Sequence, residues 1–84
     1  MGYYVYILQS EKDASYYVGS TQDIIERLKR HNQGRSKYTK SKRPWKLIHH
    51  ETCPDRPTAV KREQYIKSRK DRQYIEELVR ASRP

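Results

Sequence analysis

The sequence is short of cysteine and of long apolar runs. Cys53 is the single cysteine among 84 residues, whereas a secreted domain of this size normally depends on several paired cysteines. A disulfide framework within one chain is therefore excluded. No apolar stretch approaches the roughly 18 residues that a membrane span needs, and no basic segment followed by an apolar one resembles an export signal. We therefore expect a cytoplasmic protein.

Apolar residues are scarce in general. Hydrophobic residues make up 33% of the chain and charged residues 35%, and a chain this short buries only about 60–65% of the surface that its unfolded form exposes. The apolar residues nevertheless cluster in short periodic runs, which is typical of a folded domain and not of a disordered tail. We expect one thinly cored domain over residues 1–84.

Acidic residues are outnumbered by basic ones. Nineteen Lys and Arg face ten Asp and Glu, which gives a net charge of +9. Between Asp23 and Lys46, nine basic residues face only two acidic ones. Such a patch suits nucleic acid, because phosphate contacts that release counterions dominate affinity for it. A membrane or another acidic surface, and a merely solubilising role, are the alternatives. We expect nucleic acid, and no membrane, as the partner.

Three segments have the composition of β-strands. Tyr3–Gln9 is β-branched, aromatic or aliphatic with few polar interruptions, which predicts a central strand covered on both faces. Tyr16–Gly19 resumes this pattern after a polar loop, so the two segments predict a hairpin. A third strand is predicted over Trp45–Cys53, where alternation puts Trp45 and His49 on one face.

A helix is expected after the hairpin. Ser20 or Thr21 can cap its N-terminus, with Asp23 in the first turn. The helix should run to about Gln33, where Gly34 can take the left-handed conformation. Its apolar face is expected to consist of Ile24, Ile25 and Leu28. Residues 35–43 then form a basic loop.

Two further helices are expected near the C-terminus. Pro54 and Pro57 should bracket a turn before a helix from about Thr58 to Arg69. Asp71 is a candidate cap for a last, amphipathic helix. The order β-β-α-β-α-α predicts a small α/β domain of the α+β type, with a three-stranded antiparallel sheet flanked by helices.

Two tyrosine motifs stand in the first two predicted strands, Tyr4-Val5-Tyr6 and Tyr17-Val18-Gly19. The pattern continues with Arg27, His31, Gly34, Tyr38-Thr39, Pro44-Trp45 and Glu63. This ordered set resembles the GIY-YIG nuclease family, in particular its small single-domain branch, with Tyr4 in place of the first glycine. The resemblance covers nearly the whole chain. It implies a metal-dependent endonuclease that cuts the phosphodiester backbone of DNA and uses Mg²⁺ or Mn²⁺.

Glu63 is the most informative residue of this set. It lies four residues after Ala59 and three before Ile66, so it shares their helical face. An unpaired carboxylate is costly to bury there, so Glu63 needs a partner, which is either a divalent metal or a basic residue such as Arg27. The resemblance implies the metal, and makes Glu63 both a catalytic residue and the metal ligand.

Four other residues are catalytic candidates. Arg27 can hold a phosphate through two parallel hydrogen bonds, and the resemblance makes it the catalytic arginine. His31, one turn later, can move a proton or bind phosphate, or serve a structural role. Tyr6 and Tyr17 can orient or deprotonate a water where a cation lies beside them. Which tyrosine does which is left open.

The remaining candidates concern substrate binding. Gly19 is expected to let the backbone approach the site closely, and Ser20 to present a helix N-terminus to phosphate. Tyr38 can stack on a base, whereas Trp45 suits the core better. Basic contacts to DNA are expected from Arg30, Lys37, Lys40 and Lys42.

One position departs from the family. Many members carry an asparagine beyond the catalytic glutamate, but the sole asparagine here is Asn32, and the positions after Glu63 offer only Gln64 and Gln73. A nucleic-acid-binding module with little or no cleavage activity is therefore the alternative function. So short a chain leaves no room for a separate sequence-reading module, so we expect recognition of backbone or shape, as in nicked, flapped or branched DNA. A protein partner and the oligomeric state are left open.

Overall fold

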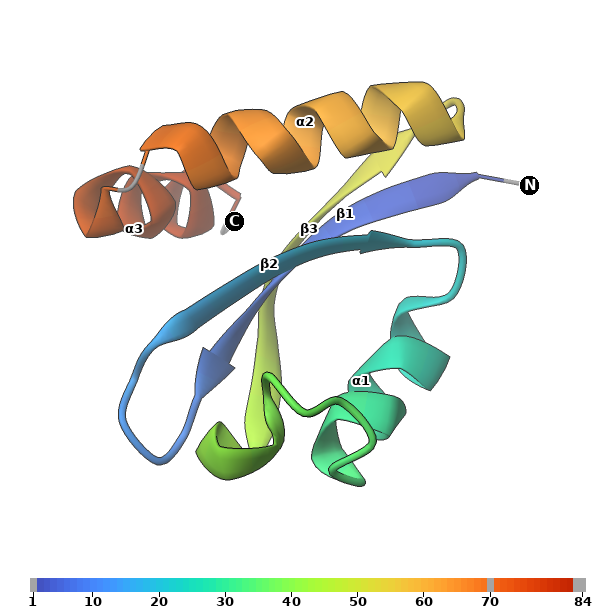
Figure 1. The fold of residues 1–84 in the computed structure, drawn as a ribbon. Helices are drawn as coiled ribbons and strands as arrows, with labels where there is room; N and C mark the ends of the chain where they lie inside the picture. The colour runs from blue at the N-terminus through green and yellow to red at the C-terminus, as the bar shows by residue number, and fades with distance from the viewer. Residues whose placement is uncertain (1, 70, 83–84) are drawn as a thin grey trace.

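The computed structural model describes residues 2–69 and 71–82. Three strands form one antiparallel sheet in the order β2-β1-β3: β1 (Tyr3–Ser10), β2 (Tyr16–Thr21) and β3 (Trp45–Cys53). The helical elements are α1 (Ile24–Asn32), the 3₁₀ turn η1 (Lys40–Lys42), α2 (Arg56–Arg69) and α3 (Arg72–Ala81). One face of the sheet is covered by α1 and the other by α2 (Figure 1). The predicted α+β class and order of elements are confirmed.

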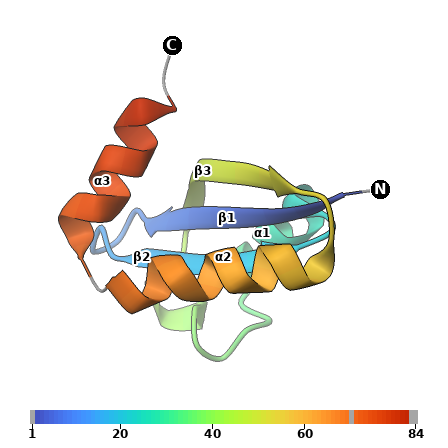
Figure 2. The same cartoon turned by 90° about the horizontal axis from the view of Figure 1, so that it is seen from above.

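The central strand β1 explains how so few apolar residues build a core on both faces. Val5 and Ile7 pack on the side of α2 and α3, whereas Tyr6 and Leu8 pack on the side of α1. None of the four is more than 1% exposed. Trp45 joins the α1 side, as its sequence context predicted. Seen from above, α2 runs along the sheet while α3 turns away at its end (Figure 2).

A β-bulge in β3 changes which residues share a face. Ile7 and Leu8 are neighbours in β1, but their partners, His49 and Leu47, are separated by one residue. Side chains alternate along a strand, so the extra residue places Trp45 and His49 on opposite faces. The prediction that these two share a face was therefore wrong.

The first helix begins later than predicted. Asp23, and neither Ser20 nor Thr21, is its N-cap, because its carboxylate accepts a hydrogen bond from the Glu26 N–H at 3.0 Å. Ser20 and Thr21 are still paired with β1, which keeps their backbone extended. Ile25 is 82% exposed, so its assignment to the apolar face was also wrong: a residue next to Ile24 is turned by about 100° around the helix axis.

The other helix ends mostly follow their predicted signals. Gly34 has a φ of +76°, the left-handed conformation expected beyond α1. Pro57 lies inside the first turn of α2, where a missing N–H costs little, and does not close the preceding turn as predicted. Asp71 caps α3 by accepting from the Gln73 N–H at 3.0 Å. Within residues 2–69 and 71–82, no helix is long and apolar enough to cross a membrane.

Candidate active site at the edge of the sheet

The candidate catalytic residues lie on four elements around the edge strand β2. Helix α1 lies on one face of the sheet, and α2 packs against β1 and β2 on the other (Figure 1). The candidates are Tyr6 on β1, Tyr17 on β2, Arg27 and His31 on α1, and Glu63 on α2. Residues far apart in the sequence are thus brought to one edge.

A chain of polar contacts joins the first tyrosine motif to the basic loop. Tyr6 Oη lies 3.2 Å from His31 Nε2, and His31 Nδ1 lies 2.8 Å from Thr39 Oγ1. All three residues are buried. Burial lowers the pKa of His31, and the nearby cations Arg27 and Arg30 lower it further. The imidazole is therefore neutral at pH 7, so one ring nitrogen donates a hydrogen bond and the other accepts one.

The Tyr6 phenol stays protonated in this environment. Burial raises its pKa above the ordinary value of about 10, and Tyr17 adds to the rise. The charge of Arg27 opposes the rise, while that of Glu63 adds a small increase. Arg27 and Glu63 thus both influence the protonation of the Tyr6 phenol, with opposite signs.

Arg27 has an unsatisfied donor. Its Nε is buried and has no hydrogen-bond partner among the described residues. Buried polar atoms are nearly always paired, so an unpaired one indicates a missing ligand or water. The side chain lines a pocket of about 220 Å³ together with Ser20 and Arg56. Two cationic side chains at one small pocket suit an anionic group.

Glu63 is held by two contacts and is mostly buried, with 18% of its side chain exposed. Ser20 Oγ donates to Oε1 at 2.7 Å, and Lys67 Nζ donates to Oε2 at 2.6 Å. Among the described residues there is no ion pair between Glu63 and Arg27, which was the alternative partner considered from the sequence. Ser20 therefore orients the carboxylate and does not cap a helix.

The donor set around Glu63 fits a hard divalent cation. Both Glu63 and Ser20 offer oxygen, and Mg²⁺ commonly takes one or two carboxylates and completes its shell with waters and phosphate oxygens. In the part of the chain that the structure describes, three or more His, Cys, Asp or Glu side chains nowhere gather as a metal site. Glu63 would therefore be the one carboxylate to hold such an ion, with substrate oxygens beside it.

Gly19 is required by the close approach of Tyr6. A β-carbon placed on Gly19 would lie 2.5 Å from Tyr6 Oη and 2.7 Å from its Cζ. Gly19 and Tyr6 are partners across the two strands, so the phenol lies directly over the glycine. The sequence analysis predicted that Gly19 lets the backbone approach the site closely. In the structure, the group in close contact with Gly19 is the Tyr6 side chain.

We expect Gly19→Ala to reduce the free energy of unfolding by about 1–3 kcal/mol, the usual range for an overfilled site. The phenol must move, which also breaks its contact with His31. Urea denaturation measures the loss. Gly2→Ala is the control, because its added carbon meets its nearest neighbour at an ordinary 3.6 Å. Equal stability of the two variants would show that Tyr6 is not tightly held.

The predicted binding residues fall into two groups. Tyr38 is 81% exposed and its ring centroid lies 6.2 Å from that of Tyr17, so it is free to contact a ligand. Lys37 and Lys40 line a cationic pocket. By contrast, the charges of Arg30 and Lys42 are already paired within the chain, with Glu26 and Asp13 respectively.

Several site residues were missed by sequence reasoning. Lys67 contacts Glu63 one helical turn away, a spacing that the sequence could have revealed. Lys12 and Arg43 join Lys37 and Lys40 at the cationic pocket, and Thr39 binds His31. The positions of Lys12 and Arg43 at this pocket depend on how two loops pack together, so no local sequence pattern predicts them.

Comparison with known proteins points to one family. The family described as the GIY-YIG catalytic domain matches residues 2–75. A UPF0213 protein of Desulfotalea psychrophila is 43% identical over 67 residues, which cover 77% of this chain and 60% of that protein, less than two thirds of its length. A UPF0213 protein of Syntrophus aciditrophicus is 47% identical over 66 residues, which cover 76% of this chain and 75% of the relative.

A solved structure is also similar over nearly the whole chain. The solution NMR structure of a UPF0213 protein from Bacillus halodurans matches with a TM-score of 0.61 and 35% sequence identity. The match covers 98% of this chain and 86% of that one. The chain thus belongs to the GIY-YIG nuclease family.

Proposed function

We propose that this protein is a metal-dependent endonuclease that hydrolyses the phosphodiester backbone of DNA. The observation that carries the proposal is the buried Nε of Arg27, which has no hydrogen-bond partner among the described residues and lies beside the Tyr6 phenol. A phosphate oxygen would satisfy this donor. Arg27 would hold the scissile phosphate and offset the negative charge that grows during displacement.

Glu63 supplies the other half of the site. Its carboxylate would hold Mg²⁺ or Mn²⁺, in the orientation that the Ser20 hydroxyl fixes. The bound ion would act as a Lewis acid toward a phosphate oxygen and lower the pKa of a water. Ser20, which donates to Glu63, lines the same pocket as Arg27, so a phosphate in that pocket would lie near both the carboxylate and the guanidinium.

The two tyrosines have different surroundings and, we propose, different tasks. Tyr6 is 1% exposed and its raised pKa keeps it protonated, so it holds His31 in place as a neutral partner. Tyr17 lines an open pocket of about 520 Å³. Its hydroxyl can therefore reach the attacking water and orient it. His31 has a lowered pKa and stays neutral at pH 7, so it accepts a hydrogen bond from Tyr6, or donates one to it, without taking its proton.

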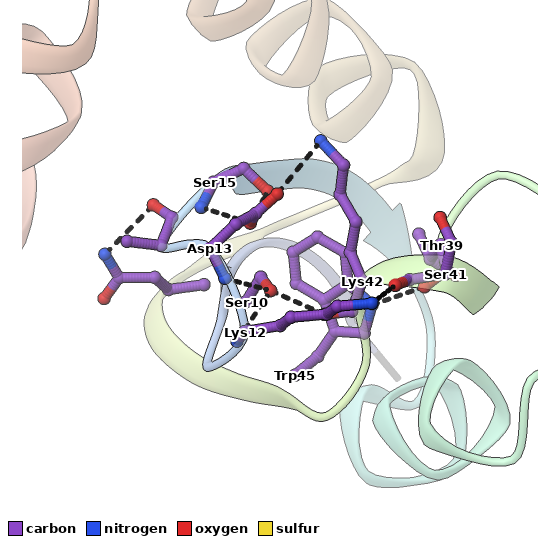
Figure 3. A network of polar contacts seen from close by, with 10 residues as sticks. Ser10, Lys12, Asp13, Ser15, Thr39, Ser41, Lys42 and Trp45 are labelled. Atoms are coloured by element: carbon purple, nitrogen blue, oxygen red, sulfur yellow. Dashed lines mark hydrogen bonds and ion pairs between the residues drawn. The ribbon is translucent and has the colours of Figure 1, made fainter.

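A cationic pocket provides the binding surface for the DNA backbone. Its volume is about 410 Å³ and its lining consists of Lys12, Lys37, Lys40, Ser41 and Arg43. Figure 3 shows the polar contacts that join the β1–β2 loop to η1. Ser10 Oγ donates to the Lys42 carbonyl, and Lys12 Nζ donates to the Ser41 carbonyl at 3.2 Å. Contacts from such cations to phosphates carry no sequence information, which supports recognition of backbone and shape.

We expect Lys40→Ala to weaken DNA binding modestly and to lower its salt dependence by about one phosphate contact. Lys42→Ala should lower it less, because the Lys42 ammonium already lies 3.6 Å from Asp13. Fluorescence anisotropy at several salt concentrations measures both slopes. Lys61→Ala, at an exposed position of α2, is the control and should leave the slope unchanged. A slope for Lys40→Ala equal to that of the control would remove the pocket from the DNA interface.

The proposed activity has a direct test. Purified protein is incubated with end-labelled linear, nicked, flapped and branched DNA in the presence of Mg²⁺, Mn²⁺ or EDTA. We expect cleavage with either metal, none with EDTA, and a preference among the DNA shapes. If no substrate is cleaved but salt-dependent DNA binding is retained, the nuclease proposal is wrong and the protein is the DNA-binding module.

One observation favours that second candidate, a DNA-binding module with little cleavage. Asn32, the sole asparagine of the chain, is used in the scaffold. Its side chain donates to the Trp45 carbonyl at 3.0 Å and accepts from the Trp45 N–H at 2.6 Å. The site around Glu63 therefore has no asparagine to draw on, and any support that this residue type gives elsewhere in the family is missing here.

A further inference from the structure

Both oxygens of the Glu63 carboxylate are engaged within the chain. The Ser20 hydroxyl donates to Oε1 at 2.7 Å, and the Lys67 ammonium donates to Oε2 at 2.6 Å. Lys67 follows Glu63 by four residues on α2, which is the favourable order for such a pair on a helix. The carboxylate proposed to hold a divalent ion is thus already neutralised by a cation of its own chain.

Of the two partners of Glu63, Ser20 is held more rigidly than Lys67. Ser20 belongs to β2, where pairing with β1 fixes its backbone. The Lys67 side chain is 49% exposed, and an ion pair with one solvated partner on a flexible stem is weak. A divalent ion that approaches Glu63 would therefore displace the ammonium and leave the hydroxyl in place.

The displaced ammonium has a second position available. Lys67 also lines the pocket of about 520 Å³ that contains Tyr17, Tyr38 and Arg72. Because Tyr17 belongs to the candidate active site, this pocket adjoins the place where the DNA strand is expected. A Lys67 ammonium released from Glu63 can contact a backbone phosphate there.

Building on the proposed function, we propose that Lys67 is a positioning residue that holds the Glu63 carboxylate until a divalent ion replaces it, and then binds a DNA phosphate. Two opposite effects follow from removing its charge. The divalent ion should bind more tightly, since a competing positive charge is gone. DNA should bind less tightly, since a phosphate contact is lost. A purely structural role for Lys67 would not move these two affinities in opposite directions.

The test is a calorimetric titration of the purified chain with Mn²⁺, without DNA. We expect Lys67→Gln to bind Mn²⁺ about three- to tenfold more tightly than the wild type, as expected for removing one cation within a few ångströms of the ion. Lys67→Arg, which keeps the charge, should stay near the wild type. Lys61→Gln removes the same charge from an exposed position on the same helix and should change the affinity by less than about twofold. Equal affinities of Lys67→Gln and Lys61→Gln would overturn the inference.

Glu63→Gln separates this inference from the proposed function. Loss of Mn²⁺ binding in Glu63→Gln, with Lys67→Gln unchanged from the wild type, would overturn the role of Lys67 and leave the metal site standing. Unchanged Mn²⁺ binding in Glu63→Gln would overturn the metal site and the role of Lys67 together. DNA anisotropy in the presence of Mn²⁺, on a DNA whose backbone resists hydrolysis, supplies the second readout, where Lys67→Gln should bind more weakly than Lys61→Gln.

Discussion

Glu63→Gln is expected to abolish metal-dependent cleavage of DNA while DNA binding stays equal or becomes slightly tighter. The substitution keeps the shape of the side chain and its contact with Ser20, but removes the charge that would hold the metal. The loss should amount to about a thousandfold or more, because a Lewis-acid metal contributes several kcal/mol to such a reaction. DNA binding is not weakened, because the substitution removes a negative charge from a surface that is proposed to contact phosphate.

The measurement pairs a cleavage assay with anisotropy on the same DNA. Glu77→Gln is the matched control, since it removes one carboxylate from an exposed position on α3 and should cleave normally. A Glu63→Gln protein that cleaves at the rate of this control would show that the carboxylate is not catalytic. The increase in net charge is the same in both variants, so a difference between them reports on the site alone.

Arg27→Ala is expected to raise the activation free energy of cleavage by roughly 2–4 kcal/mol, the range found when other donors to a transition-state oxyanion are removed. DNA binding should fall by less, because other cations share the contacts with the backbone. Since the Arg27 Nε has no partner among the described residues, no hydrogen bond is lost at that atom, and the loss of stability should be smaller than the loss of rate. This combination distinguishes a catalytic arginine from a structural one.

Single-turnover kinetics and urea denaturation on the same preparations separate the two effects. Arg27→Lys should recover only part of the rate, because an ammonium cannot form the paired hydrogen bonds of a guanidinium. Lys29→Ala, an exposed position on the same helix, is the control. Should Arg27→Ala unfold far more easily and cleave normally when folded, the residue would belong to the scaffold.

The fold could be predicted from the sequence where periodicity is local and strong. Unbroken apolar composition over residues 3–9 predicted a central strand, and the structure places β1 between the other two. The bulge in β3 could not be predicted, because one extra residue leaves the composition unchanged while it turns every later side chain to the other face. The first helix cap was missed because Ser20, Thr21 and Asp23 are all good caps, and strand pairing decided among them.

The candidate site could be assembled only with the help of the family pattern. Arg27 and Glu63 are ordinary charged residues in so basic a sequence, and 36 positions separate them. What the pattern could not supply is the environment of each group. The contact of Glu63 with Ser20 and the burial of Tyr6 against Gly19 arise from packing between elements, and they decide how each group behaves.

Thr39 gives the basic loop a property that its composition conceals. The residue is fully buried, its hydroxyl contacts His31, and its carbonyl accepts a hydrogen bond from the Trp45 indole at 2.9 Å. A loop rich in Lys, Ser and Arg normally loses considerable conformational entropy when it closes on a ligand. Here the chain is anchored at its middle before any ligand arrives, so its lysines extend from a short, preorganised platform and less entropy is lost on binding. If the loop contacts DNA as proposed, this anchoring would lower the entropic cost of each phosphate contact that its lysines make.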